Sequence, residues 1–109
     1  MGKPRERRQV SYMNRNYELG VIIPISVQES DVKAVLSTIE GWIKELGGTI
    51  TKTDNWGRRR LAYPILDFRE GYYIFFEMDF PAQRVSELEY NLKFSDQVIR
   101  HLVVRLDED

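Results

Sequence analysis

Three consecutive arginines, Arg58 to Arg60, carry the strongest chemical signal in this chain. They follow Gly57, where we expect a hairpin bend, and they run directly into a strand-like apolar segment. A guanidinium group is a planar fork of donors that matches the oxygens of a phosphate. With Trp56 and Tyr63 close by, the segment predicts a hairpin that lies against a nucleic-acid backbone. Arginine runs at turns are also often solvated charge, so the local sequence leaves both interpretations open.

We expect the nucleic-acid contacts to extend from this hairpin to basic residues near the last predicted strand. Side chains alternate along a strand, so Arg58 and Arg60 are expected on one side and Arg59 on the other. The three arginines therefore cannot all face one ridge of phosphates. The predicted RNA-binding residues are Arg58, Arg59, Arg60, Tyr63, Lys93, Arg100 and Arg105.

The composition is that of an ordinary single-domain globular protein. The chain has 109 residues, of which 42% are hydrophobic and 30% charged, and this length suits one domain with a modest core. It contains no cysteine, which excludes disulfides, thiolate metal sites and cysteine nucleophiles. No apolar run approaches the roughly 20 residues of a membrane span, and no secretion signal is visible. We therefore expect a cytoplasmic protein.

Charge is unevenly distributed along the chain. Residues 1–16 contain five basic residues against Glu6 alone, a net charge of +4, so the remaining residues carry −5 of the overall −1. Any nucleic-acid contact made by the body must therefore use local basic patches rather than its overall field. A mildly acidic body also suits a basic protein partner.

The chain is expected to contain one domain between two short extensions. Residues 1–15 lack apolar periodicity, which predicts a disordered basic arm, although Met13 could itself be an initiator. Residues 16–106 are expected to form the domain, and residues 107–109 an acidic tail.

The first part of the domain predicts a strand followed by a helix. Leu19, Val21 and Ile23 alternate with residues of other types, as in a half-buried strand. Ser26 and Glu29 fit a capping box at the start of the helix. The apolar stripe of the helix consists of Val32, Val35, Leu36, Ile39, Ile43 and Leu46.

A second strand is expected from Thr49 to about Asp54, after Gly47 and Gly48 end the helix. The arginine segment continues or bends this strand, and residues 67–71 are expected to form a loop.

Residues 72–80 form the strongest predicted strand. One of its faces is expected to pack on the helices and consists of Ile74, Phe76, Met78 and Phe80. Tyr73 and Phe75 lie on the other face, and neighbouring exposed aromatic residues suggest a docking surface for the protein partner. The alternative is that the basic arm or a loop covers both rings.

Pro81 is expected to begin a second helix, whose inner stripe is Val85, Leu88 and Leu92. The last strand is expected over residues 98–106. Neither of its faces is cleanly polar, so we expect it to be central in the sheet and partly covered on both sides. His101 in this strand is interpreted as a contact or spacer residue, because no paired carboxylate or nucleophile can be placed beside it.

The order strand, helix, strand, strand, helix, strand predicts an α+β, ferredoxin-like split βαβ fold. This fold has a four-stranded antiparallel sheet with two helices on one face and leaves the other face open. It hosts enzymes, sensors and RNA binders, so the fold alone does not decide the function.

Several segments resemble the family of bacterial small-subunit ribosomal protein six. The longest runs from Trp56 to Ile65 and reads WGRRRLAYPI, and Asn16-Tyr17-Glu18 resembles the start of the family's first strand. Further similarities lie in the second helix and last strand, at residues 81–85, at Phe94, Asp96, Val98, Ile99 and Arg100, and at residues 103–105. The chain departs from the family at Leu66, where a polar and often basic residue is usual. Its first sixteen residues also extend beyond the usual start.

The resemblance implies a structural role in the ribosome. Proteins of this family bind the central domain of small-subunit ribosomal RNA together with small-subunit ribosomal protein eighteen, a small basic partner. They use no cofactor and catalyse no reaction, so the resemblance implies neither a cofactor nor an enzyme.

Three other classes are less well supported by the residues. The segment from Glu70 to Phe76 faintly resembles the aromatic strand of an RNA-recognition module outside the ribosome, but it lacks the basic residue before the glycine. A ferredoxin-like enzyme would need a nucleophile–base pair around His101, the single histidine. A small-molecule regulatory domain would need a ligand-binding motif, and none is visible.

Overall fold

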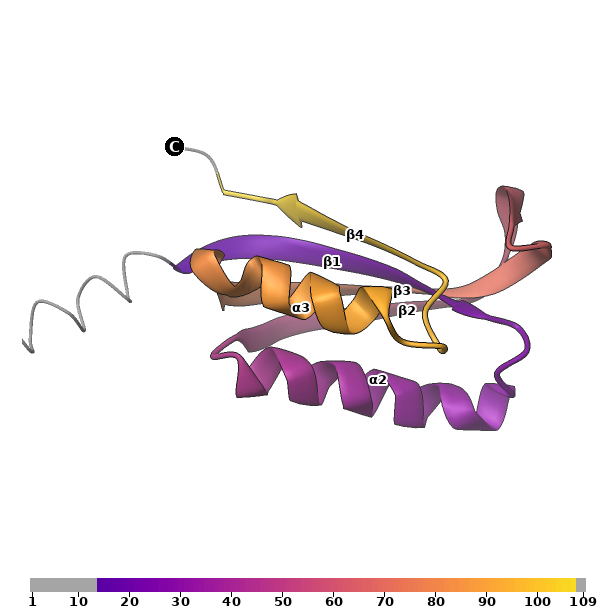
Figure 1. Cartoon of the computed structure of the whole chain (residues 1–109), viewed down its shortest axis with the longest axis horizontal. Coiled ribbons are helices and arrows are strands. Elements are labelled where there is room, and N and C mark those ends of the chain that lie inside the picture. The colour runs from indigo at the N-terminus through magenta and orange to yellow at the C-terminus, as the bar shows by residue number, and fades with distance from the viewer. Residues whose placement is uncertain (1–13, 108–109) are drawn as a thin grey trace, which may run out of the picture.

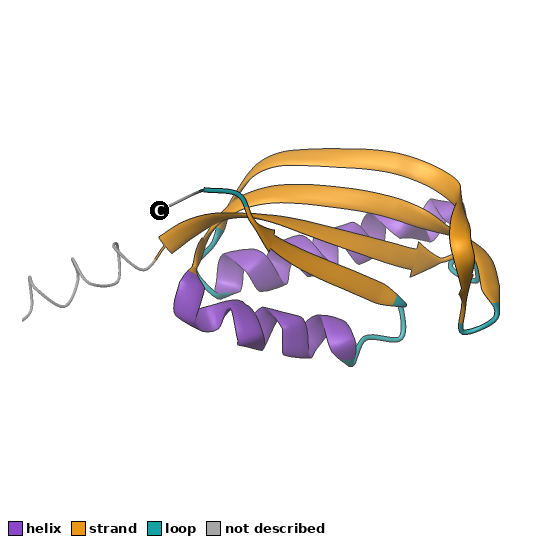
Figure 2. Ribbon diagram, turned by 90° about the horizontal axis from the view of Figure 1, so that it is seen from above, coloured by secondary structure: helices purple, strands orange, loops and turns teal. Residues whose placement is uncertain are grey.

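The computed structural model describes residues 14–107. Its elements in chain order are β1 Asn14–Pro24, α2 Glu29–Glu45, β2 Thr49–Ile65, β3 Phe68–Pro81, the 3-10 helix η1 Ala82–Arg84, α3 Val85–Lys93 and β4 Arg100–Arg105. The four strands form one sheet in the order β2-β3-β1-β4, with every neighbouring pair antiparallel. Figures 1 and 2 show both α-helices on one side of this sheet. The predicted split βαβ fold is therefore confirmed.

The core lies between the sheet and the two helices. In β1 and β3 the residues at alternating positions are fully or almost fully buried, as the sequence predicts for strands with one covered face. These residues are Tyr17, Leu19, Val21 and Ile23 from β1, and Tyr72, Ile74, Phe76, Met78 and Phe80 from β3. The predicted stripes of α2 and α3 pack on them, with Val35, Ile39 and Ile43 from α2 and Leu88 and Leu92 from α3.

The helix α2 ends as predicted but begins differently. Gly47 has φ +97°, a conformation that suits glycine. The predicted capping box is wrong, because the helix begins at Glu29 after Gln28, without a side-chain cap. Ser26 instead lies in a turn in which the N–H of Val27 donates to the carbonyl of Pro24 at 3.0 Å.

The hairpin of β2 and β3 is longer than the sequence predicts. The chain turns at Leu66 and Asp67, with φ 49° and 69°, and β3 begins at Phe68, so the predicted loop over residues 67–71 is wrong. The expected bend at Gly57 is a bulge inside β2, where the register shifts between Asn55 and Gly57. A bulge adds one residue to a strand without ending it, so the arginines lie within a continuous strand.

The strand β4 lies at an edge of the sheet and pairs with β1 alone, so the predicted central position is wrong. Its mixed pattern has a different cause. Val103 packs against the core, whereas Leu102 and Val104 are exposed on the open face. The start of the second helix also differs, because Pro81 ends β3 and precedes η1, and α3 begins at Val85.

Candidate nucleic-acid and partner interface

The three arginines of β2 alternate between the two sides of the sheet, as predicted. Arg58 lies opposite Tyr72 and Arg60 opposite Glu70 in the ladder, on the side of the helices, while Arg59 lies opposite Gly71. The strand β2 is an edge of the sheet. A ligand that runs along this edge can therefore reach side chains on both sides.

Arg58 is already paired within the protein. Its Nε donates a hydrogen bond to Glu70 Oε1 at 2.7 Å, and this hydrogen bond and charge pairing raise the pKa of Arg58 above its ordinary value. Because Glu70 offsets the charge of Arg58, this arginine attracts phosphate less than an unpaired one would.

The other two arginines are less neutralised. The guanidinium carbon of Arg59 lies 5.6 Å from the centre of the Trp56 ring, and Arg59 Nε donates to the carbonyl of Trp56 at 3.1 Å. Arg60 is exposed, and within residues 14–107 its side chain makes no hydrogen bond or ion pair. Both guanidinium groups are therefore available to an incoming anion.

Tyr73 and Phe75 point to the open face as predicted, but they are half-buried rather than exposed. The indole of Trp56 covers them. Its ring centre lies 6.4 Å from that of Tyr73, with the planes 15° apart, and 4.7 Å from that of Phe75, with the planes 55° apart. The sequence does not reveal this cover, because it depends on the bulge that turns Trp56 over the sheet.

A pocket of about 240 Å³ lies on the open face beside these rings. It is lined mainly by apolar residues from all four strands, among them Gly20, Ile22, Leu61, Ile65, Tyr73, Phe75 and Leu102. The ring of Phe75 extends over Gly20, where a Cβ would lie only 2.9 Å from it. Leu102 at the rim is 59% exposed, so the pocket offers apolar surface to a partner.

The structure brings two of the predicted site residues together across this pocket. Arg100 on β4 donates a hydrogen bond from Nη1 to the hydroxyl oxygen of Tyr63 on β2, at 2.8 Å. The two strands are opposite edges of the sheet, so the end of the hairpin must curve over the open face. Figure 1 shows this end bending away from α2.

The two remaining predicted RNA-binding residues lie elsewhere. Lys93 ends α3, and its Nζ is 5.7 Å from the centre of the Phe94 ring. Arg105 belongs to the row of β4 that includes the core residue Val103 and therefore faces the helices. The predicted set thus divides between the open face with the β2 edge and the side of the helices.

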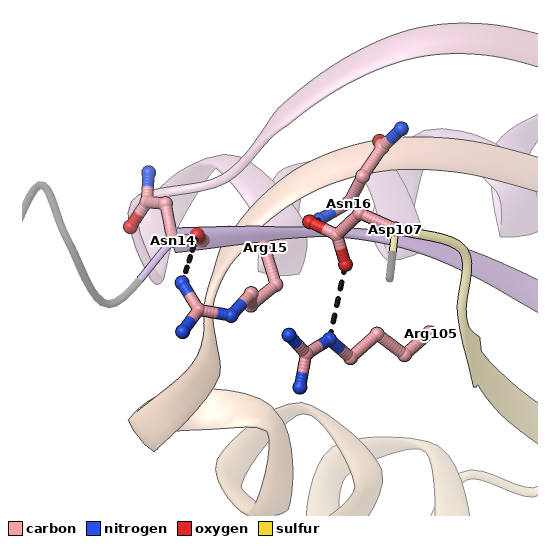
Figure 3. Close-up of polar contacts among 5 residues, drawn as sticks. All are labelled: Asn14, Arg15, Asn16, Arg105 and Asp107. Carbon is pink, nitrogen blue, oxygen red and sulfur yellow. Dashed lines mark hydrogen bonds and ion pairs between the residues drawn. The ribbon is translucent and has the colours of Figure 1, made fainter. Parts of the chain in front are cut away.

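Arg105 takes part in a polar cluster that fastens the end of the described chain to β1 (Figure 3). Its Nε donates to Asp107 Oδ1 at 3.0 Å, and the backbone N–H of Asn16 donates to Asp107 Oδ2 at 3.1 Å. The hydrogen bond from Asn16, followed by that from Arg105, holds the pKa of Asp107 below its usual value. Asp107 therefore has a structural contact besides its place in the acidic tail.

His101 has a carboxylate partner that the sequence did not reveal. Its Nε2 lies 3.3 Å from Glu89 Oε2 on α3, so the expectation that no carboxylate could be placed beside it is wrong. His101 is among the residues that line the open-face pocket and Glu89 is not, and residues 14–107 contain no group of three or more potential metal ligands. The contact joins β4 to α3.

No helix within residues 14–107 is long and apolar enough to cross a membrane.

The fold and the arrangement of this surface define a ferredoxin-like α+β domain with an arginine-bearing edge strand and an apolar open face. The model of the ribosomal protein S6 family matches residues 16–105, so this chain belongs to the ribosomal protein S6 family.

Individual relatives agree with this assignment. The chain is 38% identical over 96 residues to "Small ribosomal subunit protein bS6" of Carboxydothermus hydrogenoformans, covering 88% of this chain and 100% of the relative. It is 39% identical over 95 residues to the protein of that name from Moorella thermoacetica, covering 87% and 97%. The crystal structure of 30S ribosomal protein S6 from Thermotoga maritima matches with a TM-score of 0.81 at 30% identity, covering 85% and 88%.

Proposed function

We propose that this protein is a structural component of the small ribosomal subunit that binds the central domain of small-subunit ribosomal RNA together with small-subunit ribosomal protein eighteen. Its place of action is the ribosome in the cytoplasm, and it acts by binding, without catalysis. The observation that carries the proposal is the edge strand β2, on which Arg59 and Arg60 are available to phosphates. Membership of the ribosomal protein S6 family supports the small ribosomal subunit as the site of this contact.

The surface has separate regions for RNA and for the partner. Cationic groups gather along β2, at Arg58, Arg59 and Arg60. The pocket lies on the open face and is lined by all four strands, with Leu61 and Ile65 contributed by β2 beyond the three arginines and Leu102 by β4. A basic protein is repelled by the arginine edge and attracted by the acidic body, so the pocket suits the partner better.

The RNA-recognition alternative is weakened by the positions of the aromatic residues. Such modules stack bases directly on aromatic residues of their open sheet face. Tyr72 and Phe76 are buried on the helix side, and Tyr73 and Phe75 lie under Trp56.

The deciding experiment is mass spectrometry of purified small ribosomal subunits from the source organism. We expect this chain at a stoichiometry close to that of other small-subunit proteins after washing in high salt. Its presence only among free cytoplasmic proteins would contradict the proposal.

The partner surface is tested separately with the double variant Tyr73→Ser/Phe75→Ser and the milder variant Leu102→Ser. Both are expected to weaken binding to small-subunit ribosomal protein eighteen in calorimetry, because they remove apolar surface from the pocket. Phe94→Ser, at a residue that directly follows α3 and is about as exposed as Leu102, is the control and should bind normally. Native affinity in folded Leu102→Ser protein would show that the partner binds elsewhere.

A further inference from the structure

Trp56 forms an aromatic platform on the open face beside the β2 edge. One side of its indole packs on Tyr73 and Phe75, yet the residue as a whole is 48% exposed. A large aromatic residue that is supported on one side and about half exposed presents part of a flat ring surface to a ligand. Neither core packing nor the pocket uses this surface.

The orientation of the indole is fixed before any ligand arrives. Its Nε1–H donates to Asp54 Oδ2 at 3.2 Å. The bulge that carries it is held by the N–H of Gly57, which donates to Asn55 Oδ1 at 2.8 Å, and by the hydrogen bond from Arg59 to the Trp56 carbonyl. A ring held in this way loses little conformational entropy when something stacks on it.

A cation lies next to the platform. The guanidinium of Arg59 lies over the indole ring, with its carbon 5.6 Å from the ring centre, and Arg60 follows on the same edge strand. An aromatic face beside a guanidinium fork suits a nucleotide, whose base stacks on the ring and whose phosphate pairs with the cation.

We propose that Trp56 and Arg59 bind one unpaired nucleotide of the RNA, with its base stacked on the indole and its phosphate at the guanidinium. The inference rests on the RNA-binding function proposed above and names the form of RNA that this site accepts. A base inside a continuous duplex is stacked on both faces and cannot lie on Trp56. The site therefore takes a base from a loop, a bulge or a single strand.

The site is expected to tolerate any base. Sequence readout requires donors and acceptors that reach the edges of the base, and the indole N–H is already donated to Asp54. What remains is ring stacking and charge, which every nucleotide satisfies. A protein occupant is disfavoured because a basic partner would meet the arginines of β2.

The test measures binding of the central-domain RNA fragment, with the basic ribosomal partner present, to Trp56→Leu, Trp56→Phe and wild-type protein. Because Trp56→Leu removes one stacked base, it is expected to weaken binding about ten-fold, while Trp56→Phe retains most of the affinity. The salt dependence of binding should stay as in wild type, because no phosphate contact is removed. Tyr90→Leu, at an aromatic residue on α3 that is 64% exposed, is the matched control and should bind normally.

Fluorescence supplies a second measurement that leaves Trp56 in place and does not depend on the stability of the Trp56 variants. In Trp42→Phe protein Trp56 is the remaining tryptophan, and stacking of a base should quench its emission when the RNA fragment is added. Equal affinity of Trp56→Leu and wild type, or unchanged emission at saturation, would overturn the nucleotide site and leave the proposed function intact. Weakened binding to the partner in the absence of RNA would assign this platform to the protein and also overturn it. Failure of wild-type protein to bind the RNA at all would overturn the proposed function, and this inference with it.

Discussion

Replacement of the β2 arginines one at a time should reveal unequal contributions to RNA binding. Each phosphate contact that is lost changes the slope of log K against log salt by about 0.7 to 0.9. When salt rises fourfold, from 50 to 200 mM, each phosphate contact lowers the affinity by a factor of about three. A variant that lacks one contact should therefore lose about threefold less affinity than wild type over this range. We expect this full change for Arg59→Ala and Arg60→Ala, and a smaller one for Arg58→Ala, because Glu70 already holds that guanidinium at 2.7 Å.

Arg58→Ala has a second consequence that the structure makes testable. It leaves the Glu70 carboxylate without its partner next to the RNA, so affinity should fall even though little of the salt slope is lost. The double variant Arg58→Ala/Glu70→Ala removes both charges and should recover part of the affinity. Filter binding or fluorescence anisotropy over a series of salt concentrations measures both quantities.

A matched control is available on the other side of the molecule. Arg84 pairs with Glu87 at 3.0 Å, much as Arg58 pairs with Glu70, but it lies in η1, away from the arginine edge. Arg84→Ala should therefore leave both slope and affinity unchanged. Identical slopes for wild type and the triple variant of Arg58, Arg59 and Arg60 would refute the assignment of the β2 edge to RNA.

Three further predictions concern the turn, the chain end and the histidine. Leu66→Asn should stabilise the protein by about 1 kcal/mol in urea unfolding, because Leu66 has φ 49° and asparagine tolerates the left-handed region better; lower stability would contradict this. The low pKa of Asp107 stabilises the fold above the ordinary pKa of 3.8, and this contribution disappears as pH falls through the lower folded value. Asp107→Asn should therefore lower the melting temperature at pH 7 more than at pH 2, and an equal difference at both would argue against the contact. His101→Gln should still enter ribosomal subunits in a reconstitution assay, since its contact with Glu89 joins β4 to α3 rather than forming a catalytic pair; exclusion of the variant would show that the histidine has a larger role.

The fold could be predicted from the sequence because its strongest patterns are local. Alternation in β3 identifies the buried row of Phe76 and Met78, and the spacing of Val35, Ile39 and Ile43 identifies the inner face of α2. Strand order was harder, because apolar residues occur on both faces of β4. One row packs on the core and the other lines a surface pocket, and a single sequence does not separate these two causes.

The sequence predicts the candidate site only where the position of a side chain depends on the geometry of its own strand. Alternation of the three arginines follows from strand geometry, and their register with β3 bears it out. The platform formed by Trp56 required two features that have no clear local pattern, namely the bulge at Gly57 with φ 76° and contacts with rings on a neighbouring strand.

The ring contacts of Trp56 connect the region proposed for RNA with the region proposed for the partner. Tyr73 and Phe75 support Trp56 on one side and line the pocket on the other. A partner side chain that fills the pocket would press on the same two rings on which the indole rests. Binding of the partner should therefore restrict Trp56 further and favour stacking of a base, so that the two ligands bind more tightly together than separately. Leu102→Ser, which alters the pocket without touching Trp56, should then weaken RNA binding only when the partner is present.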